Sequence, residues 1–462
     1  MLNNLSASQQ AALIRRRDVS VRELLDAHIA AIEQHNATIN AFITLDLSSA
    51  RARADALDAQ HGRGAVSGAL FGLPIGIKDS APVAGLRFTR GSRAFADDIA
   101  TVNAAHVDNL LDAGAIVLGK TNLPELGHGR HGGQTDNAIA GLTRNPLNPA
   151  KTVGSSSGGS AAALAANFVA LADGSDIAGS IRGPAAWCGL YGLRPTSGVV
   201  PYWPKDDPFN GTDVVGPLAR TAADLRMMFD AMRSPRKASL FDTATGAAAS
   251  GADASGAAAS GTLLQGLRVA WCMAPAGAQT SDPVISALAP LRHILTDAGA
   301  VVIDAEPEFS GLHAAQAQLR QFGVFVKHGE RIAAAPALFS DELCAACAAG
   351  RGITTETLAS ALRTRDHAVH TLTRFFASVD VMVWPSSTAL PFDAEATADA
   401  IHEDWTPLEL TPVLQVPALS IPVGTTPDGM PCGAQLIGPK RSDLQLIEMA
   451  RLLEPALGLV QA

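Results

Sequence analysis

The chain has 462 residues, of which 47% are hydrophobic and 17% charged, and its formal net charge is −9. A chain of this length buries a large core, and its hydrophobic content excludes a disordered or highly charged tail protein. The negative charge, with no cluster of Lys or Arg, argues against a surface that coats nucleic acid. Composition therefore predicts a compact, soluble enzyme without a nucleic-acid partner.

The N-terminal segment MLNNLSASQQAALIRRRD lacks the apolar core of a signal peptide. No segment reaches the roughly 18–20 apolar residues of a membrane span, so no membrane partner is expected. Five scattered cysteines predict a reducing, cytoplasmic setting. Cys344 and Cys347 form a lone CxxC in an Ala-rich, helical stretch, where we expect neither a metal nor a redox role.

The first forty residues predict two helices. Ser6 with Gln9, and Ser20 with Glu23, have the spacing of a capping box, in which a side chain satisfies a free backbone N–H at the helix start. A Gly/Pro-rich segment follows, and it contains a strand-like run at residues 73–79.

Helix and strand patterns alternate along the rest of the chain. One helical stretch ends at Gly114 before a strand at 116–118, and a further helix begins near Thr221. Residues 243–261 are of low complexity and predict a flexible surface insertion, after which strand signals resume. The alternation predicts one α/β domain over residues 1–462.

Two motifs suggest functions that the surrounding residues disfavour. Residues 114–121 (GAIVLGKT) fit the P-loop pattern, but a phosphate-binding loop needs a polar, flexible interior, whereas Ala-Ile-Val-Leu here predicts a strand. Residues 154–158 (GSSSG) fit the nucleophile elbow of α/β-hydrolases. That motif requires a late histidine base, for which His402 is the candidate, and it leaves the second serine-rich turn unexplained.

Most of the candidate catalytic residues lie between residues 151 and 195. Two Gly/Ser turns, at 154–160 and 174–183, flank an apolar segment, and each can expose backbone N–H groups suited to an oxyanion. A lone lysine, Lys78, lies upstream in a Gly/Pro frame. Serines together with a lysine suggest a nucleophile system without histidine, because burial can lower the pKa of a lysine until it acts as a base.

The sequence resembles the amidase signature family. The resemblance rests on GLPIGIKD, KTVGSSSGGSAAALAA and GSDIAGSIRGPAAWCGLYGLRPTSG, and it extends to the N-terminal helices, GKTNLPELG and VPALSIPVGTTPDGMPCGAQLIGP. It covers nearly the whole chain outside residues 243–261. It implies a mixed β-sheet core sandwiched by helices, and amide hydrolysis by a Ser–cisSer–Lys triad that needs no metal or organic cofactor.

The family's motifs assign roles to residues of this chain by position. Ser180 corresponds to the nucleophile, Ser156 to the bridging serine and Lys78 to the base. The family's oxyanion hole maps to the backbone N–H groups of Ile177, Ala178, Gly179 and Ser180. Two positions depart from the family pattern, because Ser155 stands where glycine usually precedes the cis bond, and Ala178 replaces the first of a Gly-Gly pair.

Neighbouring residues are given supporting roles. Asp176 and Arg182 are expected to brace the nucleophile turn as an ion pair, and Asp79 to support Lys78 from behind. His128 and His131 have a spacing that suits a metal, but with no third ligand nearby we expect no metal site. The candidate substrate pocket consists of Leu126, Gly127, His128, Gly183, Trp203 and Phe209.

Several functions stay open within this resemblance. The leading one is a stand-alone amide hydrolase, whose partner is a small-molecule amide; a homodimer is left open. The alternatives are the A subunit of a glutamine-dependent tRNA amidotransferase complex and a hydrolase that prefers carbamates or esters. A non-catalytic relative is disfavoured because Lys78, Ser156 and Ser180 are all present.

The acyl side of the substrate is expected to be uncharged and partly apolar. Recognition of a carboxylate generally requires a positioned cation, most often an arginine. Just beyond the nucleophile the chain offers Arg182, which is assigned to Asp176, while Gly183 leaves space. Asp206 and Asp207 would repel an anion. The sequence therefore predicts a pocket without a cation.

Overall fold

The computed structural model describes residues 1–64, 67–128, 133–205, 207, 211–233, 264–397, 400–401 and 404–458. The predicted insertion at 243–261 lies outside these residues, as do four side chains that the sequence singled out: His131, Asp206, Phe209 and His402.

One large mixed β-sheet forms the centre of the molecule. Within the described residues it has 11 strands, in the order β1-β3-β2-β6-β8-β7-β12-β13-β11-β9-β10, and a separate ribbon pairs β4 with β5. The strands are β1 (Phe42–Leu45), β2 (Pro74–Lys78), β3 (Ile116–Thr121), β4 (Arg144–Asn145), β5 (Asn148–Thr152), β6 (Leu171–Asp176), β7 (Tyr191–Arg194), β8 (Val214–Ala219), β9 (Arg268–Trp271), β10 (Val301–Asp304), β11 (Val381–Pro385), β12 (Ala418–Thr425) and β13 (Pro431–Ile437).

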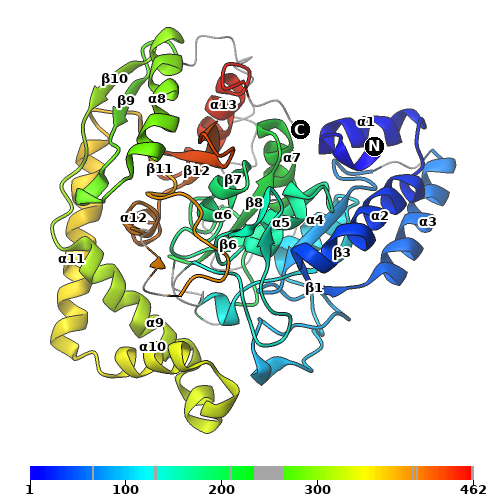
Figure 1. The fold of residues 1–462 in the computed structure, drawn as a ribbon, viewed down its shortest axis with the longest axis horizontal. Coiled ribbons are helices and arrows are strands. Elements are labelled where there is room, and N and C mark those ends of the chain that lie inside the picture. Colours follow the sequence, from blue (N-terminus) through cyan, green and yellow to red (C-terminus); the bar gives the residue numbers. More distant parts are fainter. Residues whose placement is uncertain are drawn as a thin grey trace.

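Helices flank this sheet (Figure 1), which confirms the predicted α/β class. They are α1 (Ala7–Arg16), α2 (Val21–Ile39), α3 (Leu47–Gly62), α4 (Ala105–Asp112), α5 (Gly158–Ala165), α6 (Arg182–Trp187), α7 (Ala222–Met232), α8 (Asp282–Asp297), α9 (Leu312–Ala334), α10 (Asp341–Arg351), α11 (Thr355–Phe375), α12 (Thr406–Leu414) and α13 (Asp443–Leu453). None of the described helices combines the length and apolarity that a membrane crossing requires.

The predicted helix starts are confirmed in atomic detail. Ser6 and Ser20 each accept a hydrogen bond from the backbone N–H three residues on, and Gln9 and Glu23 reach back to complete both capping boxes. Thr221 caps α7 in the same way. These local signals are strong because each satisfies N–H groups that a helix start leaves free.

The P-loop interpretation of residues 114–121 is excluded by β3, which runs through the middle of the motif. Lys120 and Thr121 lie within this strand and are fully buried. The chain therefore has no phosphate-cradling loop between Gly114 and Lys120.

The sheet topology brings the two chemical segments together. Strands β2 and β6 are parallel neighbours, so their carboxyl ends lie at the same edge of the sheet. Strand β2 ends at Lys78, and the turn that follows β6 carries Ser180 before α6 begins at Arg182. A base and a nucleophile about one hundred residues apart thus meet at one edge.

A second structural element reaches this edge from the far end of the chain. Helix α9 packs against both α10 and α11, and α9 and α10 lie at the lower left of Figure 1. Helix α9 also packs against α12. Helix α12 in turn lies close to α6: a Cβ at Gly183 of α6 would be 3.3 Å from the side chain of Leu408 of α12. The wall opposite the strand ends is therefore built from α9.

Candidate active site

Lys78 is completely buried at the end of β2, and hydroxyl groups surround its amine. Its Nζ lies 2.7 Å from Ser156 Oγ, 3.0 Å from Ser157 Oγ and 2.9 Å from Ser175 Oγ. Burial lowers the pKa of Lys78 to about 8, even though Asp213, Asp173 and Asp176 act in the opposite direction. With this pKa, about half of the Lys78 amines are neutral at pH 8 and about a tenth at pH 7.

The turn that carries Ser156 is fixed by close backbone packing. The Ser155–Ser156 peptide bond is cis, in the geometry that the family resemblance implies. Helix α5 begins directly after the turn, and a Cβ on Gly159 would lie 2.3 Å from the backbone nitrogen of Asn122. Only glycine allows this approach, which holds Ser156 against the end of β2.

The turn that carries Ser180 is held by a buried ion pair, as predicted. Asp176 accepts two hydrogen bonds from the guanidinium of Arg182, both of 3.0 Å, and neither side chain is exposed. Arg182 also donates to Gln435 Oε1 at 2.7 Å and to the backbone oxygen of Leu408 at 2.7 Å. Burial alone would raise the pKa of Asp176, but Arg182 reverses the effect and lowers it below its usual value.

The backbone N–H groups at this turn divide into two sets. Gly179, whose φ is 97°, donates its N–H to Asp176 Oδ1 at 2.8 Å, so this member of the predicted oxyanion hole is already engaged. Within the described residues, no hydrogen bond takes up the N–H groups of Ile177, Ala178 and Ser180. Three of the four predicted donors are therefore available to an oxyanion.

Asp79 supports the site through a neighbouring strand rather than through Lys78. Its carboxylate pairs with Lys120 Nζ at 2.6 Å, and both groups are fully buried. It also accepts hydrogen bonds from the Thr89 hydroxyl and the N–H groups of Thr89 and Arg90. Two buried lysines therefore lie side by side, one paired with a carboxylate and the other with hydroxyls.

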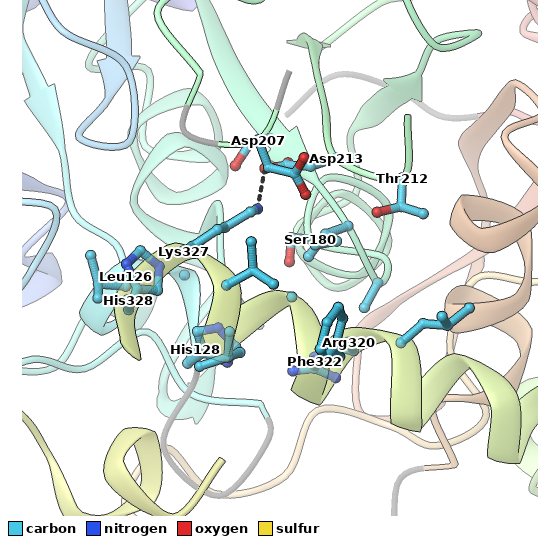
Figure 2. Close-up of a pocket in the computed structure, with 18 of the residues that line it drawn as sticks. Leu126, His128, Ser180, Asp207, Thr212, Asp213, Arg320, Phe322, Lys327 and His328 are labelled. Carbon is cyan, nitrogen blue, oxygen red and sulfur yellow. Dashed lines mark ion pairs between the residues drawn. The ribbon is translucent and has the colours of Figure 1, made fainter. Parts of the chain in front are cut away.

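A cavity of about 490 Å³ opens in front of Ser180 (Figure 2). Of the predicted pocket residues, Leu126, Gly127 and His128 line it, together with Ser156 and Ser180. Burial lowers the pKa of His128 to about 3, so its ring is neutral.

Two of the predicted pocket residues do not line this cavity. Trp203 is 51% exposed and lies outside it. Gly183 is buried in α6, and the space beside it is filled by Leu408 of α12. The sequence could not show that α12 packs there, because α12 follows more than two hundred residues later.

The prediction of a pocket without cations is wrong. Helix α9 forms the opposite wall, and Figure 2 shows Lys327 reaching from it toward Asp213, with Ser180 nearby. The Nζ of Lys327 is 3.6 Å from Asp213 Oδ2. Of the described lining residues, six are lysines or arginines: Arg90, Lys205, Arg320, Lys327, Arg331 and Arg365.

Sequence reasoning also missed Ser157 and Ser175, which contact the amine of Lys78. A signal for Ser157 existed, since it follows Ser156 in a run of three serines. No group of three or more His, Cys, Asp or Glu side chains suited to a metal occurs among the described residues.

Comparison with known proteins gives consistent relatives. The family profile described as Amidase matches residues 23–447. Over 308 residues the chain is 36% identical to the acylamidase of Rhodococcus erythropolis, a match that covers 67% of this chain and 63% of that protein. Over 474 residues it is 31% identical to the A subunit of the glutamyl-tRNA(Gln) amidotransferase from Synechococcus sp. (strain CC9605), covering 95% of this chain and 94% of that one.

The fold has a close counterpart among solved structures. A bacterial aryl acylamidase of the amidase signature family superposes with a TM-score of 0.88 at 24% identity, covering 98% of this chain and 96% of the other. This similarity concerns the fold.

Proposed function

The chain belongs to the amidase signature family and is an amide hydrolase, and we propose that it cleaves a small, uncharged amide through an acyl-enzyme on Ser180. The observation that carries this proposal is the amine of Lys78, which is fully buried and 2.7 Å from Ser156 Oγ. An ammonium would need a counter-ion at that depth, whereas a neutral amine is satisfied by hydroxyl groups. Lys78 is thus suited to be a base.

The proposed reaction begins with proton transfer toward Lys78. The neutral amine accepts the proton of Ser156, which takes the proton of Ser180 as Ser180 Oγ attacks the amide carbonyl carbon. The resulting oxyanion is stabilised by the N–H groups of Ile177, Ala178 and Ser180, each worth roughly 10²–10³ in rate. The transfer from Ser180 to Ser156 is part of the proposal.

The second half of the reaction returns the proton. Lys78 protonates Ser156, which protonates the leaving nitrogen as the carbon–nitrogen bond breaks, and the amine departs. A water molecule, deprotonated along the same path, then attacks the acyl ester. This step releases the carboxylic acid and regenerates the Ser180 hydroxyl.

We propose that the substrate is uncharged because most of the cations of the cavity wall are engaged in ion pairs, and not because the cavity lacks cations. Four of the six cations in the cavity wall are paired with carboxylates: Arg90 with Asp98, Arg320 with Glu409, Lys327 with Asp213 and Arg365 with Asp366. At these four positions a substrate carboxylate would have to displace the partner. A neutral amide leaves these ion pairs intact.

The test of the reaction uses the purified chain alone with a panel of neutral amides and anilides. Release of the amine or ammonia, together with a mass increase on the peptide that contains Ser180, is expected for the wild type and absent from Ser180→Ala. Turnover by Ser180→Ala at the wild-type rate would refute the mechanism. A preference in kcat/KM for a same-length amide that ends in a carboxylate would refute the uncharged substrate.

A second candidate function rests on one observation. The amidotransferase A subunits match nearly the full length of this chain, as in the 95% coverage of the Synechococcus protein. In this alternative the chain would release ammonia from glutamine only within a complex. Hydrolysis of simple amides by the chain alone would contradict it, whereas a chain that is inactive alone and releases ammonia from glutamine once partner subunits are added would support it.

A further inference from the structure

A buried histidine and a buried aspartate lie directly behind Lys78, and the proposed mechanism does not use them. The Oδ1 atom of Asp173, on β6, accepts the backbone N–H of Lys78 at 2.6 Å. Its Oδ2 atom lies 2.9 Å from Nε2 of His106, on α4. Lys78 and His106 are 0% exposed and Asp173 is 1% exposed, so solvent satisfies none of them.

The hydrogen bond from Lys78 to Asp173 lies just beyond the point where the pairing of β2 with β6 ends. Strands β2 and β6 are paired only at Ile75 with Leu171 and at Gly76 with Ala172. Two residues further along β2, the side chain of Asp173 takes up the N–H of Lys78 in place of a strand neighbour. The position of the base therefore depends on this carboxylate and on the ring that holds it.

We propose that His106 and Asp173 are positioning residues of the amide hydrolase, which hold the end of β2 and keep a fixed negative charge behind Lys78. An ionised carboxylate only accepts hydrogen bonds, so Nε2 of His106 is the donor. The Nδ1 atom of the same ring has no hydrogen-bond partner among the described residues. A neutral ring with its proton on Nε2 fits both observations, and it leaves the charge of Asp173 in place.

Other charges also act on this region. The pKa of Lys78 is also raised by the negative charges of Asp213, from the loop before β8, and of Asp176, from the same strand as Asp173. On the neighbouring strand β3, Lys120 is paired with Asp79, and the charge of Asp173 also raises the pKa of Lys120. Removing the charge of Asp173 is therefore expected to remove only its own contribution to the pKa of Lys78, while the contributions of Asp213 and Asp176 remain.

The charge is tested with Asp173→Asn. The amide oxygen can still accept the N–H of Lys78, and its NH₂ group can donate to His106 once the ring proton moves to Nδ1. Because the anion raises the pKa of Lys78, its removal should lower the midpoint of the pH–rate profile by roughly one pH unit. The matched control is Asp224→Asn, since Asp224 is also buried and accepts the N–H groups of Ala7 and Ser8.

The positioning role is tested at His106. His106→Leu leaves Asp173 without its donor, and kcat should fall roughly 10–100-fold with little change in KM, because the base is displaced. His106→Gln restores a donor and should recover most of kcat. The matched control is His28→Gln, because His28 is fully buried but contacts Asn167 and Gln10 instead.

The readout is the second-order rate at which a neutral fluorophosphonate labels Ser180 between pH 5 and 10, with kcat and KM on an active amide. The inference rests on Lys78 as the base, so the pH-dependent limb must first disappear in Lys78→Met; if it persists, the proposed function fails. If the limb belongs to Lys78 but its midpoint is the same in Asp173→Asn and wild type, the charge role is wrong. If Asp173→Asn does not fold, equal kcat in His106→Leu and His106→Gln overturns the positioning role.

Discussion

Lys78→Met is the most informative single substitution in this protein. Methionine is close in length to lysine and apolar, so it can occupy the buried site while removing the amine. We expect kcat to fall by roughly 10³-fold, within the range of lost general-base catalysis. The ascending limb of the pH–rate profile, below pH 8, should disappear with it.

The size of the pH effect follows from the burial of Lys78. With its pKa lowered from 10.5 to about 8, about 9% of the lysine is neutral at pH 7, compared with about 0.03% for an ordinary lysine. Burial thus raises the fraction of active base about 300-fold. In the wild type, kcat/KM should rise about tenfold per pH unit below pH 8 and then level off.

The same shift makes a prediction for stability. The pKa of Lys78 is lower in the folded chain than in the unfolded one, so between pH 8 and 10.5 the unfolded chain binds more protons. The free energy of unfolding therefore gains from this group as the pH rises, and loses as the pH falls. Relative to Lys78→Met, the wild type should become more stable by about 2.5 kcal/mol from pH 7 to pH 10.

The assay combines pH–rate profiles with denaturant unfolding at both pH values. The control is Lys120→Met, the neighbouring buried lysine, which should destabilise the protein by roughly 3–5 kcal/mol because it leaves Asp79 buried without its partner. A wild-type profile without a limb near pH 8, or an unfolding difference between wild type and Lys78→Met that does not change with pH, would refute a neutral Lys78.

Three further outcomes are expected. Ser156→Ala should lower kcat by roughly 10²–10⁴ without loss of fold, because it interrupts the proton path; near-normal turnover would show that Lys78 reaches Ser180 without it. Arg182→Met should lower the free energy of unfolding by roughly 3–5 kcal/mol, since it leaves Asp176 uncompensated, and an unchanged denaturation midpoint would contradict the bracing role. Trp203→Ala should leave kcat/KM within about twofold, because Trp203 is 51% exposed and outside the cavity; a larger loss would place it in the substrate site.

The parts of the site that sequence could predict are those carried by continuous segments. Helix starts at Ser6 and Ser20 depend on residues within three positions, so their pattern is visible locally. The ion pair of Asp176 with Arg182 spans six positions in one turn, and it also follows from the local sequence. Interactions of this range need no knowledge of the fold.

The opposite wall of the cavity could not be predicted in the same way. Lys327 lies 3.6 Å from Asp213 although the two residues are more than one hundred positions apart. Their meeting depends on how α9 packs against α12, which no local pattern of α9 specifies. The expectation of a cation-free pocket failed for this reason: it considered only the charges next to the nucleophile in the sequence.

The two buried lysines show how packing assigns chemistry that residue type leaves open. Lys78 and Lys120 lie on adjacent parallel strands, in register with Thr121 and Ile77, and both are 0% exposed. Burial lowers the pKa of both groups. Their partners differ, because Lys120 faces the carboxylate of Asp79 at 2.6 Å, which favours a charged amine, whereas the amine of Lys78 meets three serine hydroxyls. A carboxylate partner makes a buried lysine a structural cation, and hydroxyl partners allow it to give up its proton; this difference in partners is why we assign the base to Lys78.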